Sequence, residues 1–221
     1  MHPDLLLTLA TVPLFANIPQ PELVKLAAMA RQENYAKNAE IMAEGDRSSG
    51  LYILLSGKVK VVLRSEEGKE IILAILNPTE FFGEMALLDE APRSADIVTM
   101  APTTVLVIAK QEFKNWLQRQ PEMSFVIIKT LAQRLREADR KIGDLALMDV
   151  YGRVARALMG LAKEDSQGRM VVSENLSQQS LADIVGASRE MVSRTLKDLA
   201  HVGHIWFDGK DVIVNTRAER V

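Results

Sequence analysis

The segment from Phe82 to Ala95 concentrates residue types that bind a phosphate and a sugar. Arg93 carries a guanidinium whose fork of donors matches two phosphate oxygens, and Ser94 adds a hydroxyl donor. Gly83 has no Cβ, so a ligand can approach the backbone there. Glu84 can accept a hydrogen bond from a ribose hydroxyl, and we expect Arg93 to keep this carboxylate ionised. The alternative interpretation is a helical turn with a surface Glu–Arg pair.

A second group of residues is typical of a surface that reads DNA. Gly186 permits a tight turn between two helices, and Ser188 is a favourable N-cap for the second one. Arg189 and Arg194 then lie on the outward face of this second helix. Since such a helix contacts base edges with its N-terminal residues, both arginines are candidate readers of guanine. Residues 205–214 predict a strand–turn–strand wing, whereas the alternative for the whole segment is a helical hairpin of another purpose.

Short strands and one long helix are expected to position these groups. Between residues 35 and 109, regularly spaced glycines and alternating apolar residues predict strands of a barrel or jelly roll. A long helix is expected to begin at Pro121. Its apolar residues recur at spacings of three and four: Ile128, Leu131, Leu135, Ala138, Ile142 and Leu145. This heptad pattern favours a helix paired with its own copy over one packed only within its own domain.

Composition excludes several classes of function. The 221 residues suffice for one large or two small domains, and the net charge of −2 requires any nucleic-acid contact to be local. Because the chain has no cysteine and three histidines (His2, His201 and His204), we expect no metal, haem or iron–sulfur cluster. An enzyme is disfavoured on the same ground. With no long apolar run and no signal-peptide pattern, we expect no membrane contact and a cytoplasmic location.

The phosphate-binding pattern resembles the cassette of cyclic-nucleotide-binding domains, with Gly83, Glu84, Ala86-Leu87 and Pro92-Arg93-Ser94-Ala95 at the family spacing. From about residue 12 to its end, the chain resembles the CRP/FNR family of bacterial transcription regulators. The resemblance implies an α+β fold with an N-terminal β-roll, a long dimerisation helix and a C-terminal winged helix-turn-helix. The expected domains are residues 1–120, 121–147 and 148–221, respectively.

The resemblance also implies two sets of binding residues. Those for the ligand are Gly83, Glu84, Met85, Ala86, Arg93, Ser94, Ala138 and Asp139. Those for DNA are Ser177, Gln178, Ser188, Arg189, Glu190, Ser193, Arg194 and Lys197. The combination of Arg189, Glu190 and Arg194 matches the catabolite-activator branch, whose half-site is TGTGA. The absent cysteines likewise argue against a cluster of the FNR type.

The identity of the nucleotide is open at this stage. In the cAMP-responsive branch, adjacent threonine and serine hold the adenine, but Ala138 and Asp139 occupy the aligned positions here. A carboxylate suits the two neighbouring donors of guanine, so cyclic di-GMP is as strong a candidate as cAMP. If cyclic di-GMP is the ligand, the roles implied for Arg93 and Ser94 are less secure. The alternative for Asp139 is a solvated carboxylate.

The expected function is that of a ligand-responsive homodimer that binds palindromic double-stranded DNA through TGTGA-type half-sites. RNA polymerase is expected as a further partner, because residues 163–169 correspond to a polymerase-contacting loop in relatives. Two alternatives are a constitutive DNA-binding dimer and a nucleotide-sensing regulatory subunit that acts on a protein partner.

Overall fold

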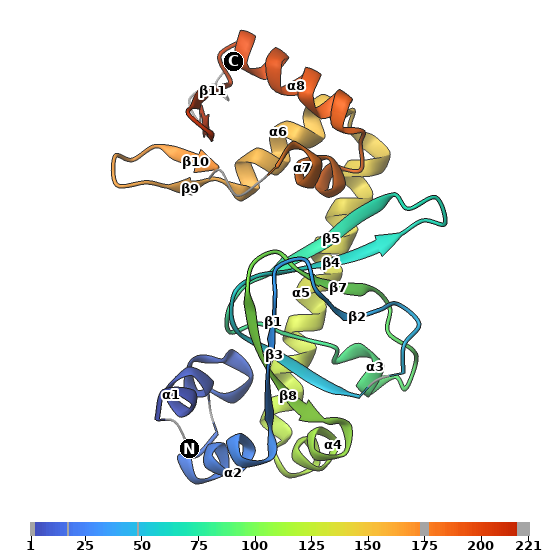
Figure 1. The fold of residues 1–221 in the computed structure, drawn as a ribbon, viewed down its shortest axis with the longest axis vertical. Coiled ribbons are helices and arrows are strands. Elements are labelled where there is room, and N and C mark those ends of the chain that lie inside the picture. The colour runs from blue at the N-terminus through green and yellow to red at the C-terminus, as the bar shows by residue number, and fades with distance from the viewer. Residues whose placement is uncertain (1–2, 17, 48, 173–176, 216–221) are drawn as a thin grey trace. The chain divides into compact units, whose positions relative to one another are not determined.

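The computed structural model describes residues 3–16, 18–47, 49–172 and 177–215. The chain divides into two compact units, and their boundary falls within the long helix α5 (Pro121–Leu147). The first unit contains residues 1–68 and 72–136, and the second contains residues 69–71 and 137–221. Among the described residues, the strands form three four-stranded sheets (Figure 1). The predicted α+β fold class is confirmed.

The N-terminal part of the first unit is helical. It consists of α1 (Pro3–Thr11), a short 3-10 helix (Pro13–Phe15) and α2 (Gln20–Met29). Pro13 and Pro21 lie at the starts of the 3-10 helix and of α2, where a missing N–H breaks no helical hydrogen bond. Phe15 packs edge-on against Trp116 of α4 (Lys110–Arg119), with the ring centroids 5.9 Å apart. This contact joins the first helices to the end of the strand region.

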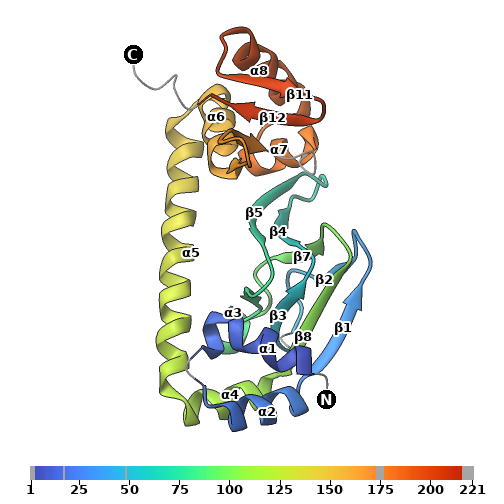
Figure 2. The same cartoon turned by 90° about the vertical axis from the view of Figure 1, so that its left-hand side faces the viewer.

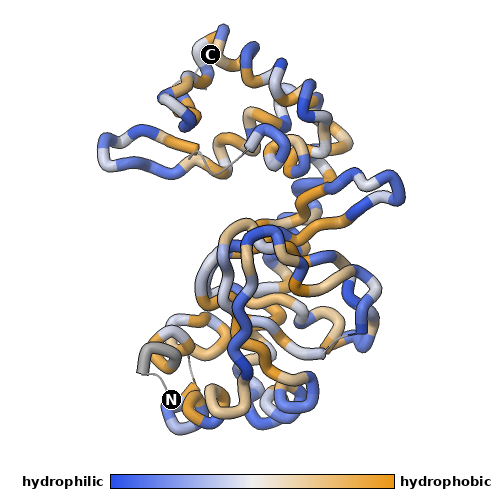
Figure 3. Tube along the Cα trace, in the orientation of Figure 1, coloured by the Kyte–Doolittle hydropathy of each residue, from blue (hydrophilic) through white to orange (hydrophobic). Residues whose placement is uncertain are grey.

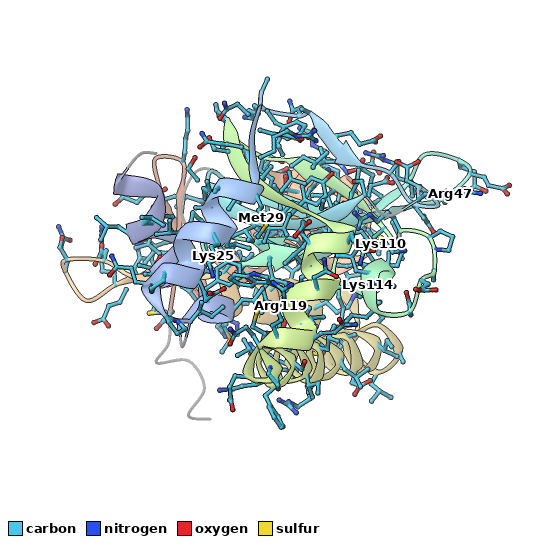
Figure 4. All side chains as sticks on the ribbon, turned by 90° about the horizontal axis from the view of Figure 1, so that it is seen from below. Lys25, Met29, Arg47, Lys110, Lys114 and Arg119 are labelled. Atoms are coloured by element: carbon cyan, nitrogen blue, oxygen red, sulfur yellow. The ribbon has the colours of Figure 1, made fainter. Side chains whose placement is uncertain are left out.

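The surfaces of α2 and α4 carry several cations, which Figure 4 shows from the side on which these helices lie. Lys25 of α2 forms an ion pair with Glu22, and Lys114 of α4 forms one with Glu90. Part of the positive charge on this surface is therefore neutralised within the unit itself.

Two antiparallel sheets form the β-roll of the first unit. One has the order β1 (Arg31–Tyr35), β8 (Thr103–Ala109), β3 (Gly50–Ser56) and β6 (Phe81–Phe82). The other has the order β2 (Glu40–Met42), β7 (Asp96–Thr99), β4 (Val59–Arg64) and β5 (Glu70–Leu76). The predicted jelly-roll type of architecture is thus confirmed, and the turn predicted at residues 66–69 does connect β4 to β5.

The central strands β3 and β8 are buried on both faces, which explains their nearly continuous apolar sequence. Leu51 and Ile53 of β3 belong to the core that includes the helices. Tyr52 and Leu54 alternate with them and belong to the core between the sheets. Figure 3 shows hydrophilic residues at the tip between β4 and β5.

Helix α5 begins at Pro121, as predicted, and continues without interruption to Leu147 (Figure 2). Met123 and Ile127 are buried in the core of the first unit. The predicted heptad positions Ile128, Leu135 and Ile142 are instead 60, 63 and 64% exposed. The described chain therefore leaves most of this apolar seam uncovered.

The second unit contains the predicted helix-turn-helix and wing. Its elements after α5 are α6 (Val150–Leu161), β9 (Lys163–Glu164), β10 (Met170–Val172), α7 (Gln178–Val185), α8 (Arg189–His201), β11 (Ile205–Asp208) and β12 (Asp211–Val214). Its sheet has the order β11-β12-β10-β9. The polar loop predicted at residues 163–169 is wrong in its first two residues, because they form β9 and pair with β10. Within the described ranges, no helix meets the length and hydropathy needed to cross a bilayer.

Candidate nucleotide pocket and DNA-reading helix

The phosphate-binding segment lines a pocket of about 70 Å³ in the first unit. The pocket is formed by strands of the β-roll, by the segment from β6 through the short helix α3 (Met85–Leu88), and by α5. Its lining includes Gly83, Glu84, Met85, Ala86, Arg93 and Ser94, and also Met42, Val61, Leu76, Phe82, Ala95, Ile97 and Arg134. Six of the eight expected ligand residues are therefore brought together.

Gly83 is required by the close approach of Arg93. Its φ is +82°, and a Cβ at this position would lie 2.5 Å from Nη1 of Arg93. The Gly83 carbonyl accepts a hydrogen bond from that nitrogen at 2.6 Å. A side chain here would strain the backbone and displace the guanidinium at the same time.

Arg93 is a buried cation without a carboxylate partner in the described chain. Its side chain is held by two carbonyl oxygens, with Nη1 donating to Gly83 and Nη2 donating to Gly50 at 2.9 Å. The guanidinium also lies over the ring of Tyr52, 5.7 Å from its centroid. Burial lowers the pKa of Arg93 from its ordinary value. Carbonyl dipoles orient this cation but do not neutralise it, so the site favours an anionic ligand.

Glu84 is 1% exposed, and its two carboxylate oxygens differ in their environment. Oε1 accepts a hydrogen bond from Nη1 of Arg134 at 2.6 Å. Oε2 is buried and has no hydrogen-bond partner within the described structure. A buried acceptor without a partner is costly, and a hydroxyl group from a ligand would satisfy it.

Arg93 is expected from the sequence to keep Glu84 ionised, and the two charges do attract each other. The guanidinium of Arg93 is nevertheless bonded to backbone carbonyls, and Arg134 of α5 forms the ion pair with Glu84. Arg134 also donates from Nη2 to the Phe81 carbonyl at 2.5 Å. Sequence reasoning missed this residue because it is one of several charges that flank the heptad seam, and no local signal distinguishes it.

The remaining cassette residues have simpler positions. Ala86 of α3 is buried, whereas Met85 and Ser94 are exposed. The Ser94 hydroxyl lies 3.9 Å from Sδ of Met85, which is a weak acceptor. A phosphate oxygen would be a stronger acceptor for the same hydroxyl.

Ala138 and Asp139 are not among the residues that line this pocket. Both lie on α5 with exposed side chains. They share this part of the helix with the exposed seam residues Leu135 and Ile142. Ala138 and Asp139 belong to the second unit, whereas the pocket lies in the first.

The helix-turn-helix has well-formed helix ends. Ser177 caps α7 by accepting a hydrogen bond from the Ser180 N–H at 3.0 Å. Ser188 caps α8 by accepting one from the Met191 N–H at 3.2 Å. Gly186 ends α7 with a φ of +63°, as the predicted turn requires. These local bonds set the start of α8 and hence the direction of its first turn.

Helix α8 separates a buried face from an exposed one. Its inward residues are Val192, Thr195, Leu196 and Leu199. The expected DNA contacts Arg189, Glu190, Arg194 and Lys197 are exposed, as is Gln178 of α7, while Ser193 is partly exposed. The structure therefore places the candidate readers on one accessible side of the second unit.

Arg153 of α6 is a supporting residue that sequence reasoning missed. Its Nε donates to the Val185 carbonyl at 2.8 Å, and its Nη1 donates to the Met148 carbonyl at 2.8 Å. These bonds hold the C-terminal end of α7 against α6, directly before the turn. Ala182 of α7 is fully buried.

Family models match both parts of the chain that contain these residues. The model of the cyclic nucleotide-binding domain matches residues 32–120, and that of the Crp-like helix-turn-helix domain matches residues 152–219. The chain is 33% identical over 210 residues to the CRP-like cAMP-activated global transcriptional regulator of Mycobacterium tuberculosis, covering 94% of each chain. It is 34% identical over 201 residues to the cAMP-activated global transcriptional regulator Vfr of Pseudomonas aeruginosa, covering 87% of this chain and 92% of Vfr.

Comparison with solved structures also finds transcription regulators of this kind. The c-di-GMP responsive global regulator CLP of Xanthomonas campestris aligns with a TM-score of 0.77 and 26% identity, over 89% of this chain and 99% of CLP. The catabolite activator protein of Thermus thermophilus aligns with a TM-score of 0.55 and 32% identity, over 93% and 95% of the two chains. With both domains matched in order and relatives this similar over nearly the whole length, the chain belongs to the CRP/FNR family of transcription regulators.

Proposed function

We propose that the protein is a homodimeric, cytoplasmic transcription regulator whose affinity for DNA is set by a cyclic nucleotide bound in the β-roll. The observation that carries this proposal is the pair of unsatisfied groups in the pocket. Arg93 is a buried cation without a carboxylate partner, and Oε2 of Glu84 is a buried acceptor without a donor, in the described residues. A cyclic phosphate and a ribose hydroxyl supply the missing anion and donor on one molecule.

Of the two nucleotides, cAMP is the better fit to this pocket. The pocket contains one cation, Arg93, that forms no ion pair with a carboxylate among the described residues. A single cation of this kind suits a single phosphodiester, whereas cyclic di-GMP has two. The relatives from M. tuberculosis and P. aeruginosa, at 33 and 34% identity, are described as cAMP-activated. Cyclic di-GMP remains the second candidate, because Asp139 suits guanine and CLP is described as c-di-GMP responsive.

The exposed seam of α5 supports a dimer. Ile128, Leu135 and Ile142 present large apolar side chains to solvent at heptad spacing. Burying each against a second copy would stabilise the dimer by roughly 1.5–3 kcal/mol per side chain at most. We propose the helix at residues 121–147 as the dimerisation element, between a β-roll domain at 1–120 and a DNA-binding domain at 148–221. A dimer would also bring Ala138 and Asp139 beside their copies.

The chemistry of α8 supports a TGTGA-type half-site. Arg189 and Arg194 would each present a bidentate donor to guanine, and Glu190 would accept from the cytosine amine of the complementary strand. Ser177, Gln178 and Ser188 would contact phosphates from the ends of α7 and α8, and Lys197 would do so along α8. The β9–β10 turn is the proposed contact for RNA polymerase.

The test is fluorescence anisotropy of a labelled TGTGA-N6-TCACA duplex, titrated with protein alone, with cAMP and with cyclic di-GMP. We expect cAMP to lower the dissociation constant for this duplex and to leave a scrambled duplex unaffected. A response to cyclic di-GMP alone would overturn the assignment of cAMP. Tight binding that neither nucleotide changes would favour a constitutive dimer instead, and absence of binding under all conditions would favour a regulatory subunit that acts on a protein partner.

A further inference from the structure

The backbone of Arg93 is held by the loop at residues 43–46, which follows β2. The Gly45 N–H donates to the Arg93 carbonyl at 2.8 Å, and the Arg93 N–H donates to the Asp46 carbonyl at 2.9 Å. The other end of Arg93 is anchored on the carbonyls of Gly83 and Gly50. Since both backbone bonds of Arg93 go to this loop, a shift of the loop would move the guanidinium within the pocket.

The loop is in turn fixed by Asp96, the first residue of β7. Asp96 is 6% exposed, and both of its carboxylate oxygens are used. Oδ1 accepts a hydrogen bond from the Glu44 N–H at 2.7 Å, and Oδ2 accepts one from Nη1 of Arg64 at 2.5 Å. The same nitrogen of Arg64 reaches Glu40 of β2 at 3.0 Å. One buried carboxylate therefore ties together β7, the loop and the end of β4.

We propose that Asp96 is a positioning residue for the phosphate-binding Arg93, an inference that rests on the proposed function. Asp96 is not among the residues that line the pocket, so it acts on the ligand only through other groups. The charge-assisted bond from Asp96 to the Glu44 N–H holds the loop. The loop in turn holds the backbone of Arg93, which lies three residues before Asp96 in the sequence. Arg64, whose side chain is 36% exposed, balances the buried charge.

The first test compares nucleotide binding by Asp96→Ala and Asp96→Asn in the full-length dimer, measured by isothermal titration calorimetry with cAMP and with cyclic di-GMP. Asp96→Ala removes two charge-assisted hydrogen bonds and should raise the dissociation constant for the nucleotide roughly 10- to 100-fold. Asp96→Asn keeps an oxygen for the Glu44 N–H and should recover most of that loss. The matched control is Asp165→Ala in the second unit, which removes a carboxylate with similar bonds to Arg169 and should leave nucleotide affinity unchanged.

A double-mutant cycle separates positioning from a general loss of structure. In an Arg93→Lys background, the ammonium cannot bond both carbonyls, so Asp96→Ala should cause a much smaller further loss than it does beside Arg93. In a Glu84→Gln background, by contrast, Asp96→Ala should cause the same further loss of nucleotide affinity as it does in the wild type. Equal losses in all three backgrounds would overturn the proposal, and so would wild-type affinity in a folded Asp96→Ala protein.

Two further outcomes are distinguishable. If Asp96→Ala does not fold, as judged by circular dichroism, Arg64→Met tests the same network, because it removes the group that balances Asp96. Wild-type affinity in a folded Arg64→Met protein would then contradict the proposal, and weakened affinity would support it. If the wild type binds neither nucleotide, the proposed function itself fails, which the wild-type titration shows independently of any variant.

Discussion

Arg93 and Glu84 carry opposite charges in one pocket, yet they form no ion pair with each other. Arg93 is bonded to the carbonyls of Gly83 and Gly50, and Glu84 is paired with Arg134. The pocket therefore retains one positive charge and one buried oxygen, Oε2 of Glu84, that lacks a partner in the described structure. At the residue scale, these two deficits define which ligand chemistry the protein can accept.

Removing the cation should remove the response to nucleotide. We expect Arg93→Ala to lose about 1.5–3 kcal/mol of binding free energy, the usual value for a hydrogen bond to a charged group. Binding to DNA without nucleotide should stay as in the wild type, because α8 lies in the other unit. Calorimetry with nucleotide and anisotropy with DNA check the two parts separately. An unchanged response to nucleotide would place the ligand elsewhere.

Removing the counter-ion of Glu84 should destabilise the first unit. Arg134→Met leaves a buried carboxylate without its partner, and breaking such a pair typically costs about 3–5 kcal/mol. Because Arg134 is 28% exposed, we expect a loss toward the lower end of this range. Urea unfolding measures this loss in the free energy of unfolding. The control is Arg136→Met, which removes an exposed side chain of the same helix. Adding Glu84→Gln to Arg134→Met should restore part of the lost free energy of unfolding.

At the scale of elements, α5 has two functions along its length. Its first turns are part of the core of the β-roll through Met123 and Ile127, and Arg134 reaches the carboxylate of the pocket. Most of its remaining large apolar residues are exposed, among them Ile128, Leu135 and Ile142. A single helix thus carries both a group that touches the nucleotide site and the proposed dimer contact, so a change at one can bias the other.

Charged residues in the α5 seam should dissociate the dimer. We expect Leu135→Asp and Ile142→Asp each to convert the protein to monomers at micromolar concentration, since each would bury a carboxylate in an apolar contact. Analytical ultracentrifugation reads the oligomeric state. Gln133→Asp introduces the same charge at an exposed position outside the heptad pattern and should leave the dimer intact. If both seam variants remained dimeric, another surface would have to pair the chains.

For the whole molecule, the question is how occupancy of the β-roll changes the affinity of α8 for DNA. A nucleotide shifts this affinity only to the extent that it binds the DNA-competent dimer more tightly than the other form. By thermodynamic linkage, bound DNA must then raise the affinity of the protein for the nucleotide by the same factor. A nucleotide titration with and without the TGTGA duplex measures this factor directly.

Specificity at the DNA end should depend on Arg189. We expect Arg189→Ala to lose about 1–3 kcal/mol of discrimination against a substituted guanine in the half-site. Lys197→Ala, on the same helix, should weaken all duplexes nearly equally and reduce the salt dependence of binding. Competition anisotropy with single-base variants of TGTGA distinguishes these results. Full discrimination by Arg189→Ala would contradict the proposed half-site assignment.

The sequence by itself determined the features whose causes are local. The cap by Ser188, the turn at Gly186 and the start of α5 at Pro121 each depend on a few neighbouring residues, so their signals are legible in the chain. The cassette from Gly83 to Ser94 was also predicted as a unit, because its residues act within one short segment.

Only the tertiary structure decided the partners of the charged groups. Arg134 lies 50 residues from Glu84, Gly50 lies 43 residues from Arg93, and Asp96 lies 52 residues from Glu44. No periodicity or spacing encodes these contacts. They arise because the sheets of the β-roll bring distant strands and loops together, and because buried polar groups in such a core must find partners wherever the packing places them.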